Sequence, residues 1–303
     1  MRTACPVCAS GSRAGTGALP RKYLIRDTSV LVDGIAGFGV VECGSCRLIY
    51  RTHSTTPEAE RALQEIWNAG DQTRWHTAES PGVRAIASLV RELAVASIGR
   101  GSIQLADIGP GEGDFLRLLG PEFAQTGIEL NDALGGAMAS RGFAIVHANI
   151  EDDRIDVPRR FDVITAFDVF EHFARPNAAL RNIHGLLNDG GLLIVETGNV
   201  ESYPARRNGP HAWWYSQILE HKILWGAGSL SRALQEAGFA IERVVLKAHK
   251  GQRLGAVRPW FKWMLYEISP ALYARTSGTP APALKPPKMP WRDHVLIVAR
   301  KSR

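Results

Sequence analysis

Four cysteines stand in two closely spaced pairs near the N-terminus, and the chain has no others. The pairs are Cys5 with Cys8 and Cys43 with Cys46, each separated by two residues. Each C-x-x-C turn can direct two thiolates at one ion, and two turns complete the tetrahedral four-sulfur site that zinc prefers. Iron accepts the same ligands, and a redox dithiol is the weaker alternative. Because four thiolates leave no position for water, the pattern predicts a structural zinc ribbon over residues 1–50.

A glycine-rich turn is the second pattern with chemical meaning. It reads DIGPGEG over residues 107–113 and follows a predicted strand at residues 102–108. Gly109, Gly111 and Gly113 allow the backbone to approach a ligand closely. Open α/β sheets bind ligands at this place, where the first strand ends. The turn therefore predicts a nucleotide-type cofactor site.

Acidic and polar residues extend this predicted site. Glu129 lies twenty residues after the first glycine of the turn, at the end of the next predicted strand, where a carboxylate accepts hydrogen bonds from both ribose hydroxyls. Asn149 and Ile150 follow the third predicted strand, within reach of an adenine edge. The turn also carries Glu112 and Asp114, acids that repel a pyrophosphate but suit an ammonium and a sulfonium. This charge favours S-adenosylmethionine over NAD.

Alternating apolar runs and helical segments predict the scaffold for these residues. The alternation implies an α/β fold with a mainly parallel sheet and helices on both faces. We expect strands at residues 102–108, 126–130, 144–148, 161–167, 191–196, 239–246 and 294–299, and helices at 114–119, 133–141, 177–187 and 229–237. The ribbon itself should contain short strands at residues 30–32 and 38–42.

The predicted domains are the zinc ribbon at residues 1–50, a helical connector and lid at 51–100, and a cofactor-binding catalytic domain at 101–303. A cap insertion at about residues 250–292 interrupts the last of these and is rich in tryptophan and proline.

Composition narrows the class of protein further. With 45% hydrophobic and 22% charged residues, the 303-residue chain can build an ordinary core. A net charge of +6 permits nucleic acid as a partner without requiring it. The sequence has no apolar run long enough for a transmembrane helix. The N-terminus lacks the apolar core of a secretory signal, so we expect a cytoplasmic protein with reduced cysteines.

Four motifs, in chain order, resemble those of the class I S-adenosylmethionine-dependent methyltransferases. They are DIGPGEG at 107–113, GIEL at 127–130, FDVITAFDVFEH at 161–172 and LNDGGLLIVETGN at 187–199. The resemblance covers residues 82–249 and 293–300. It implies a Rossmann-like seven-stranded sheet whose last two strands form an antiparallel pair.

The same resemblance implies which residues bind the cofactor. These are Asp107, Gly109, Gly111, Glu129, Leu130, Asn149, Ile150 and Asp168. Asp107 and the two glycines would line the methionine half, Glu129 would hold the ribose, and Asp168 would lie near the sulfonium. Asn149 departs from the family, which usually has Asp there, but its amide oxygen can still bond the adenine amino group.

The ribbon and this domain together are similar to a narrower group, bacterial methyltransferases of antibiotic, deoxysugar and polysaccharide pathways. The segment EHKILWGAGSLSRALQEAGF at 220–239 matches their pattern. Their sugar C-methyltransferases carry Tyr-His-Glu-His, whereas this chain has Ile218, Leu219, Glu220 and His221 at those positions. The missing Tyr and first His argue against deoxysugar C-methylation.

Methyl transfer to a hydroxyl or an acidic carbon needs a base as well as alignment of the acceptor. His172 ends the motif at 161–172, and His221 follows Glu220 in a segment expected to roof the pocket. His172, His221 and Glu220 are the catalytic candidates. A histidine suits the role of base because its pKa lies near neutral pH. The alternative interpretation is that both histidines are structural.

Two classes of acceptor fit the sequence. The first is a small molecule of a biosynthetic pathway, methylated on O, N or C. The alternative is RNA held by the ribbon, but the chain lacks the Asn/Asp-Pro-Pro-Tyr/Phe motif of nucleobase N-methyltransferases, and its ribbon has scattered arginines rather than a basic cluster. The sequence favours the small molecule. A cofactor-binding regulator without catalysis stays open, as does a homodimer formed through the ribbon.

Overall fold

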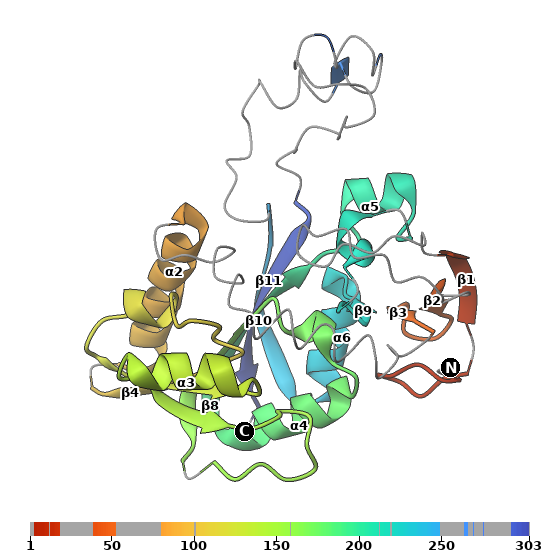
Figure 1. Ribbon diagram of the computed structural model, residues 1–303. Coiled ribbons are helices and arrows are strands. Elements are labelled where there is room, and N and C mark those ends of the chain that lie inside the picture. Colours follow the sequence, from red (N-terminus) through yellow and green to blue (C-terminus); the bar gives the residue numbers. More distant parts are fainter. Residues whose placement is uncertain are drawn as a thin grey trace.

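The structure is a computed structural model, shown in Figure 1. It describes residues 3–11, 13–18, 39–52, 80–99, 101–157, 159–211, 213–218, 220–248 and 292–302, together with positions 264, 265, 269 and 275. Three predicted features fall mainly on residues that are not described. They are nearly all of the predicted cap at about 250–292, the strand expected at 30–32 and most of the helical connector before residue 80.

A seven-stranded sheet forms the centre of the molecule (Figure 1). Its strands are β4 (Ile103–Ile108), β5 (Phe123–Glu129), β6 (Ala144–His147), β7 (Phe161–Phe167), β8 (Leu187–Gly198), β10 (Phe239–Lys247) and β11 (His294–Lys301). Their order is β10-β11-β8-β7-β4-β5-β6, and β11 runs antiparallel to both of its neighbours. This arrangement confirms the predicted Rossmann-like sheet and its antiparallel last pair.

Helices cover both faces of this sheet. Along each strand, successive side chains point to opposite faces, so each strand contributes to two apolar clusters. On β4, Ile103 and Leu105 join one apolar cluster, which also contains Val90 of α2 (Pro81–Ile98). Ala106 and Ile108, whose side chains point to the opposite face, join the other cluster. The helices α4 (Pro176–Leu186) and α6 (Ala227–Glu236) pack on that second side. Two further α-helices among the described residues are α3 (Asp132–Ser140), which packs on β6, and α5 (Tyr203–Asn208).

The N-terminal ribbon is joined to the rest of the chain through a shared sheet. Its strands β1 (Arg13–Ala18), β2 (Gly39–Cys43) and β3 (Ile49–Arg51) are antiparallel, and β9 (Ile223–Leu224) adds a fourth strand next to β3. The buried cysteines belong to the same apolar cluster as α4 and α6. The ribbon therefore folds against the segment that follows His221, a pairing that the sequence did not predict.

One predicted helix is wrong. Residues 114–119 form only the short 3-10 turn η1 (Leu116–Leu118). Gly113, with φ of 78°, precedes this turn, and Gly120 follows it. The chain therefore re-enters the sheet at Phe123 before a longer helix can develop. No helix among the described residues has both the length and the apolar character needed to cross a membrane.

Candidate active site and cysteine cluster

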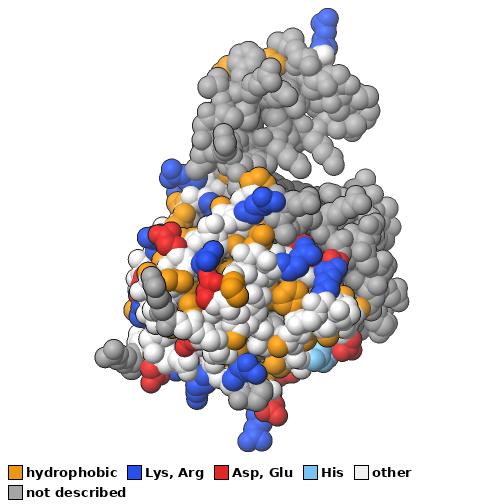
Figure 2. Space-filling view, turned by 90° about the vertical axis from the view of Figure 1, so that its left-hand side faces the viewer, with side chains coloured by type: hydrophobic (Ala, Val, Ile, Leu, Met, Phe, Trp, Pro, Cys, Tyr) orange, Lys and Arg blue, Asp and Glu red, His pale blue; other side chains and the backbone are white. Residues whose placement is uncertain are grey.

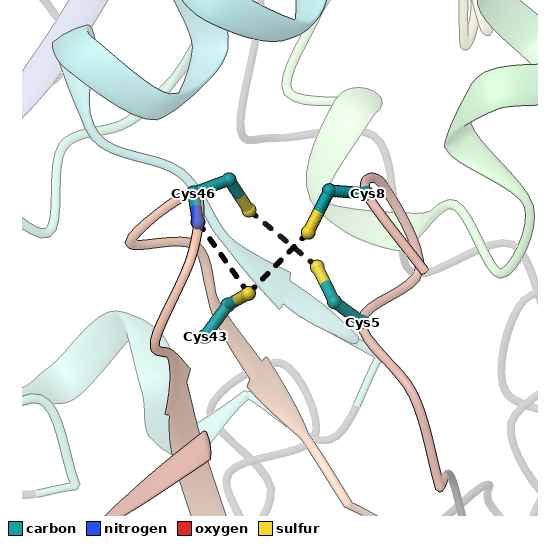
Figure 3. Close-up of side chains that lie close together, drawn as sticks. All are labelled: Cys5, Cys8, Cys43 and Cys46. Carbon is teal, nitrogen blue, oxygen red and sulfur yellow. Dashed lines mark hydrogen bonds between the residues drawn. The ribbon is translucent and has the colours of Figure 1, made fainter. Parts of the chain in front are cut away.

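The four cysteine side chains converge, as Figure 3 shows. The sulfur atoms of Cys5 and Cys46 are 3.5 Å apart, and those of Cys8 and Cys43 are 3.4 Å apart. All four sulfur atoms lie within 4.8 Å of one another. Two sulfur atoms bound to one zinc ion at about 2.3 Å each would be separated by no more than about 4.6 Å. Both measured spacings satisfy this limit, so the cluster fits the predicted zinc ribbon.

The residues predicted to bind the cofactor lie along one edge of the central sheet. Asp107 is near the end of β4, Glu129 ends β5, Asn149 follows β6 and Asp168 follows β7. These strands are neighbours in the order β6-β5-β4-β7, and they are parallel. Their carboxyl ends therefore meet at one edge, where open α/β sheets bind ligands. Buried Asp107 accepts a 2.7 Å hydrogen bond from Thr165 Oγ1 on β7, which ties two of the strands together there.

The glycine-rich turn leaves space beside the backbone. Gly109 and Gly111 have φ angles of 63° and 58°, a region that favours glycine. A Cβ atom on Gly109 would lie 2.9 Å from Val169 Cγ2, whereas one on Gly111 would meet nothing within 4 Å. The turn is therefore closed on the side of β7 and open at Gly111, where a cofactor can approach the chain.

Glu129 is a buried carboxylate with few partners from the protein itself. It is 7% exposed, and its Oε1 accepts a 2.8 Å hydrogen bond from the N–H of Asn131. Burial raises the pKa of this carboxyl group. Hydroxyl donors from a ribose would supply the hydrogen bonds that a buried carboxylate needs. The observed setting fits the predicted role.

The other members of the predicted cofactor set differ in exposure. Leu130 is 60% exposed, so its side chain lies at the surface beside Glu129. Ile150 is buried. The amide oxygen of Asn149 accepts a 3.0 Å hydrogen bond from the N–H of Glu151, which leaves one lone pair for an adenine amino group. All eight assignments stay predictions.

A buried carboxylate, Glu171, lies at the centre of a polar cluster next to the cofactor edge. It belongs to the short turn η2 (Phe170–His172), and its side chain is inaccessible to solvent. Its Oε2 accepts a 2.7 Å hydrogen bond from Thr197 Oγ1, and its Oε1 accepts one from the hydroxyl of Tyr215. The Nε2 atoms of His221 and His172 lie 3.8 Å and 4.0 Å from Oε1. The structure thus brings both predicted histidines together around Glu171.

Backbone groups fix the orientation of both rings. Nδ1 of His221 is 2.8 Å from the carbonyl oxygen of Tyr215, and Nδ1 of His172 is 3.2 Å from that of Glu220. Because a carbonyl oxygen only accepts, each Nδ1 carries the proton. In the neutral ring each Nε2 therefore carries a lone pair and no proton. Glu220, the third predicted catalytic residue, acts here through its backbone carbonyl, and the cluster contains Glu171 where the sequence suggested Glu220.

The electrostatics of this cluster favour neutral groups. Burial, together with the charge of nearby Asp168, raises the pKa of Glu171. Burial also lowers the pKa of His221 well below its usual range, and neighbouring His172 adds to that effect. The pKa of Tyr215 lies well above its usual value, because of burial and the adjacent Glu171. A proton is therefore held by the carboxyl group or the phenol more readily than by the imidazole of His221.

A second histidine pairing was missed by the sequence analysis. Asp168 has a positive φ of 53° and its N–H donates to the carbonyl of Glu196 at 2.9 Å. Fully buried His294 lies between two acids, with Nδ1 3.1 Å from Asp293 Oδ1 and Nε2 3.7 Å from Asp168 Oδ1. Burial alone lowers the pKa of His294, but these acids outweigh it and raise the pKa. In the sequence, the available signal was a histidine at the start of the last predicted strand. In the structure, that strand places His294 opposite Gly198 at the end of β8.

The ribbon contacts the segment that carries Tyr215 and His221. Arg51, at the end of β3, is 2% exposed. Its Nη2 donates to the carbonyl oxygens of Ser216 at 2.8 Å and Ile218 at 2.5 Å. The turn η3 (Trp214–Gln217) is therefore attached directly to the ribbon. This guanidinium is a positioning group that the sequence analysis did not single out.

The fold and the cofactor edge define a Rossmann-like methyltransferase. A family described as "Methyltransferase domain" matches residues 75–244, more than half of the chain. The chain belongs to this family and is an S-adenosylmethionine-dependent methyltransferase. No curated protein matches it.

Solved structures show the same fold at low sequence identity. The N-methyltransferase NodS from Bradyrhizobium japonicum WM9, in complex with S-adenosyl-L-homocysteine, has a TM-score of 0.51 and 17% identity, covering 80% of this chain and 98% of its own. The plantazolicin methyltransferase BamL, with a triazolic desmethylPZN analog and S-adenosyl-L-homocysteine, has a TM-score of 0.52 and 16% identity, covering 80% and 91%. A chain from the complex of the Haloferax volcanii Trm112 methyltransferase activator with a methyltransferase has a TM-score of 0.50 and 14% identity, covering 79% and 98%.

Proposed function

We propose that this methyltransferase modifies a small-molecule acceptor of a bacterial biosynthetic pathway, on O, N or C, and acts in the cytoplasm. The observation that carries the proposal is the cluster of Glu171, His172 and His221, next to Asp168 at the cofactor edge. A site that removes a proton from the acceptor needs such a group beside the methyl donor. The similarity to NodS and BamL shows the fold alone.

His172 is the group we assign to proton removal. Its side chain is 30% exposed, whereas His221 is 6% exposed and Glu171 is inaccessible. His172 can therefore reach an acceptor, with its Nε2 lone pair available because Glu220 holds Nδ1–H. His221 packs against this ring with centroids 4.9 Å apart and supports its position. In this proposal His172 takes the predicted role of base, and His221 becomes a positioning residue.

S-adenosylmethionine supplies a methyl group that its sulfonium already activates. When bound, the cofactor would transfer this methyl group to the acceptor atom, and the electron pair of the broken sulfur–carbon bond would stay on sulfur. The proton of that acceptor passes to Nε2 of His172. Asp168 would lie near the positive sulfonium, and the edge formed by Glu129, Asn149 and Ile150 would hold the nucleoside.

For the ribbon we propose one structural zinc ion, held by Cys5, Cys8, Cys43 and Cys46. The converging sulfur atoms fit a tetrahedral site, and four thiolates leave no coordination position for a substrate. The ion would therefore stabilise the ribbon and take no part in methyl transfer. The homodimer expected through the ribbon stays a prediction.

An RNA acceptor is the alternative that we disfavour. In Figure 2, which shows one face of the molecule, Lys and Arg side chains stand singly among acidic and apolar ones. Within the described ribbon, Arg47 pairs with Glu42 at 2.5 Å, and Arg51 is buried. The charge of exposed Arg47 is therefore offset by Glu42, and Arg51 is not accessible to a phosphate backbone.

Label transfer separates the two acceptors. Radiolabelled S-adenosylmethionine is supplied to the enzyme with total RNA or with a small-metabolite extract of the source organism. We expect label in the small-molecule pool, whose mass spectrum then identifies the acceptor. Nuclease-sensitive label in RNA would overturn the proposal.

The Glu129→Ala variant tests the cofactor edge. Hydrogen bonds to a charged group contribute about 1.5–3 kcal/mol each, so the loss of two ribose contacts should weaken S-adenosylmethionine binding by roughly 100-fold or more. Calorimetry measures this affinity. Glu122→Ala is the matched control, because Glu122 lies just before the opposite end of the same strand and pairs with Arg91 at 2.5 Å. Unchanged affinity in Glu129→Ala would refute the assignment.

A further inference from the structure

The three side chains around Glu171 have an arrangement that hydrogen bonding does not explain. The Nε2 atoms of His221 and His172 are 3.8 Å and 4.0 Å from Glu171 Oε1, too far for hydrogen bonds. Both rings donate from Nδ1 to backbone carbonyls, so neither Nε2 carries a proton when the ring is neutral. Two nitrogen atoms that carry lone pairs therefore lie within 4.0 Å of a carboxyl oxygen, with no proton shared between them. Such an arrangement is stabilised by a cation placed between the three atoms.

Metal-binding histidines in proteins show the same orientation. They bind the ion through one nitrogen and donate the other N–H to a carboxylate or a backbone carbonyl, which fixes the ring. Here Tyr215 and Glu220 supply those carbonyls. The carboxylate is held in the same way, because Thr197 and Tyr215 donate to its two oxygens. The surroundings needed by three metal ligands are therefore already built.

The distances also match a single ion. Two donors bound at about 2.1 Å to one metal ion are separated by no more than about 4.2 Å. Both distances to Glu171 Oε1 satisfy this limit, and the three ligand atoms all lie within 4.8 Å of one another. The ring of His172 is the ligand that would adjust its position to the ion, because it is partly exposed whereas the other two side chains are buried.

We propose that Glu171, His172 and His221 form a second metal site, which takes a divalent transition-metal ion through Glu171 Oε1 and both Nε2 atoms. Two imidazoles and one carboxylate suit zinc, cobalt, nickel or iron(II) rather than magnesium or calcium, which prefer oxygen ligands. Three protein ligands leave a coordination position open, in contrast to the closed four-thiolate ribbon. We therefore expect the second ion to exchange readily, while the ribbon ion is retained.

One consequence rests on the proposed function, although ion binding itself does not. The ion uses the same Nε2 lone pair of His172 that removes the acceptor proton. An occupied site therefore cannot act as the base, and methyl transfer should fall as the site fills. Binding of S-adenosylmethionine, at the neighbouring strand ends, should stay unchanged.

Cobalt(II) is the probe for this site. The full chain is isolated with zinc in its ribbon, dialysed against a chelator, and titrated with cobalt(II) while absorbance is recorded. We expect one cobalt ion per chain, with d–d bands and without the intense sulfur-to-metal charge-transfer absorption of a thiolate site. The absence of stoichiometric binding would overturn the proposal, as would a spectrum with thiolate charge transfer.

Two variants connect the signal with these residues. His172→Ala removes a partly exposed ligand and should weaken cobalt binding at least tenfold, and Glu171→Gln should have a similar effect. His184→Ala is the matched control, because that partly buried histidine lies on α4, where its ring packs against Phe239 at 5.3 Å. Equal affinity in His172→Ala and the native chain would refute the site. If the chelator-treated chain binds cobalt but shows no methyl transfer with any acceptor before cobalt is added, the metal site would stand and the proposed function would be overturned instead.

Discussion

The cysteine cluster and the Glu171 cluster both gather atoms that bind metals within 4.8 Å, but they are assembled in different ways. The sulfur atoms come from two turns, and each turn contributes two ligands only three residues apart. The Glu171 cluster needs η2, the end of β8 and the segment before β9 to come together. A metal site built from local turns can be recognised in a sequence, whereas one assembled by the sheet cannot.

The two clusters also differ in how their charge is compensated. Four thiolates can be buried together only beside a cation. Around Glu171, two hydroxyl donors already satisfy the carboxyl group, and burial raises its pKa toward the neutral form. The ribbon should therefore depend on its ion for folding, whereas the Glu171 cluster can exist with or without one.

Loss of a ribbon ligand should have the largest effect. Cys43→Ser removes a fully buried thiolate, and zinc binding in small zinc domains is coupled to folding by about 10 kcal/mol or more. After dialysis against a chelator, which removes the exchangeable second ion, we expect bound zinc, measured by plasma mass spectrometry, to fall from one ion per chain to near zero, together with soluble yield. Ser45→Ala lies in the same turn at an exposed position and is the matched control. Full zinc content in Cys43→Ser would show that the cysteines hold no ion.

The same contrast explains how much of the molecule the sequence could predict. The glycine-rich turn, Glu129 and the order of the apolar runs are local signals. They were sufficient to predict the sheet, and the residues expected to bind the cofactor lie at one edge of it, although their role stays a prediction. The failed helix at 114–119 shows the limit of such signals, because η1 ends where the chain must return to β5. Helix propensity alone does not predict where the chain must return to the sheet.

Long-range partners were beyond the sequence. His172 and His221 were predicted separately, but their common partner Glu171 became apparent only when Tyr215 and Thr197 were seen to bond to it. Neighbouring Glu220 was the more obvious acid, because it precedes His221 directly. No periodicity or spacing relates a turn after β7 to a segment some fifty residues later.

Arg51 connects the two clusters and should give an intermediate effect. Arg51→Lys keeps a cation but loses the forked geometry that reaches two carbonyls. Displacement of Tyr215 and His221 should lower kcat about 10-fold, since small misplacements of catalytic groups are costly. Arg51→Met should lower it further. Kinetics with the acceptor found by label transfer measures the change.

Three readouts separate positioning from general damage. Zinc content and S-adenosylmethionine affinity should match those of the native chain in Arg51→Lys, and kcat should change more than KM. Arg47→Ala is the control, because Arg47 lies on the same ribbon with a side chain that is 76% exposed. A normal kcat in both Arg51 variants would mean that the ribbon and the Glu171 cluster act independently.

The smallest expected effect is on stability and concerns His294. This residue packs against Tyr215 and compensates the negative charge of the neighbouring acids. Asp293 and Asp168 flank this buried ring, Glu196 adds to their negative charge, and Tyr215 packs against it at 5.4 Å. These acids raise the pKa of His294 in the folded protein above its unfolded value near 6.5. The stabilisation is therefore fully present below about pH 6.5 and is lost as pH rises through the folded pKa. In His294→Gln this contribution disappears at every pH.

The difference in melting temperature between the native chain and His294→Gln isolates that contribution, because other titrations largely cancel. We expect the native chain's advantage to be largest near pH 6 and to shrink steadily toward pH 9. A contribution of about 1 kcal/mol corresponds to roughly 2–4 °C for a domain of this size, which calorimetry resolves.

His184→Gln serves as the control, because burial lowers the pKa of His184 and so predicts the opposite slope. A pH-independent difference for His294→Gln would mean that the acids beside the cofactor edge are not balanced by an imidazolium. The catalytic region would then resemble the ribbon in needing a bound cation.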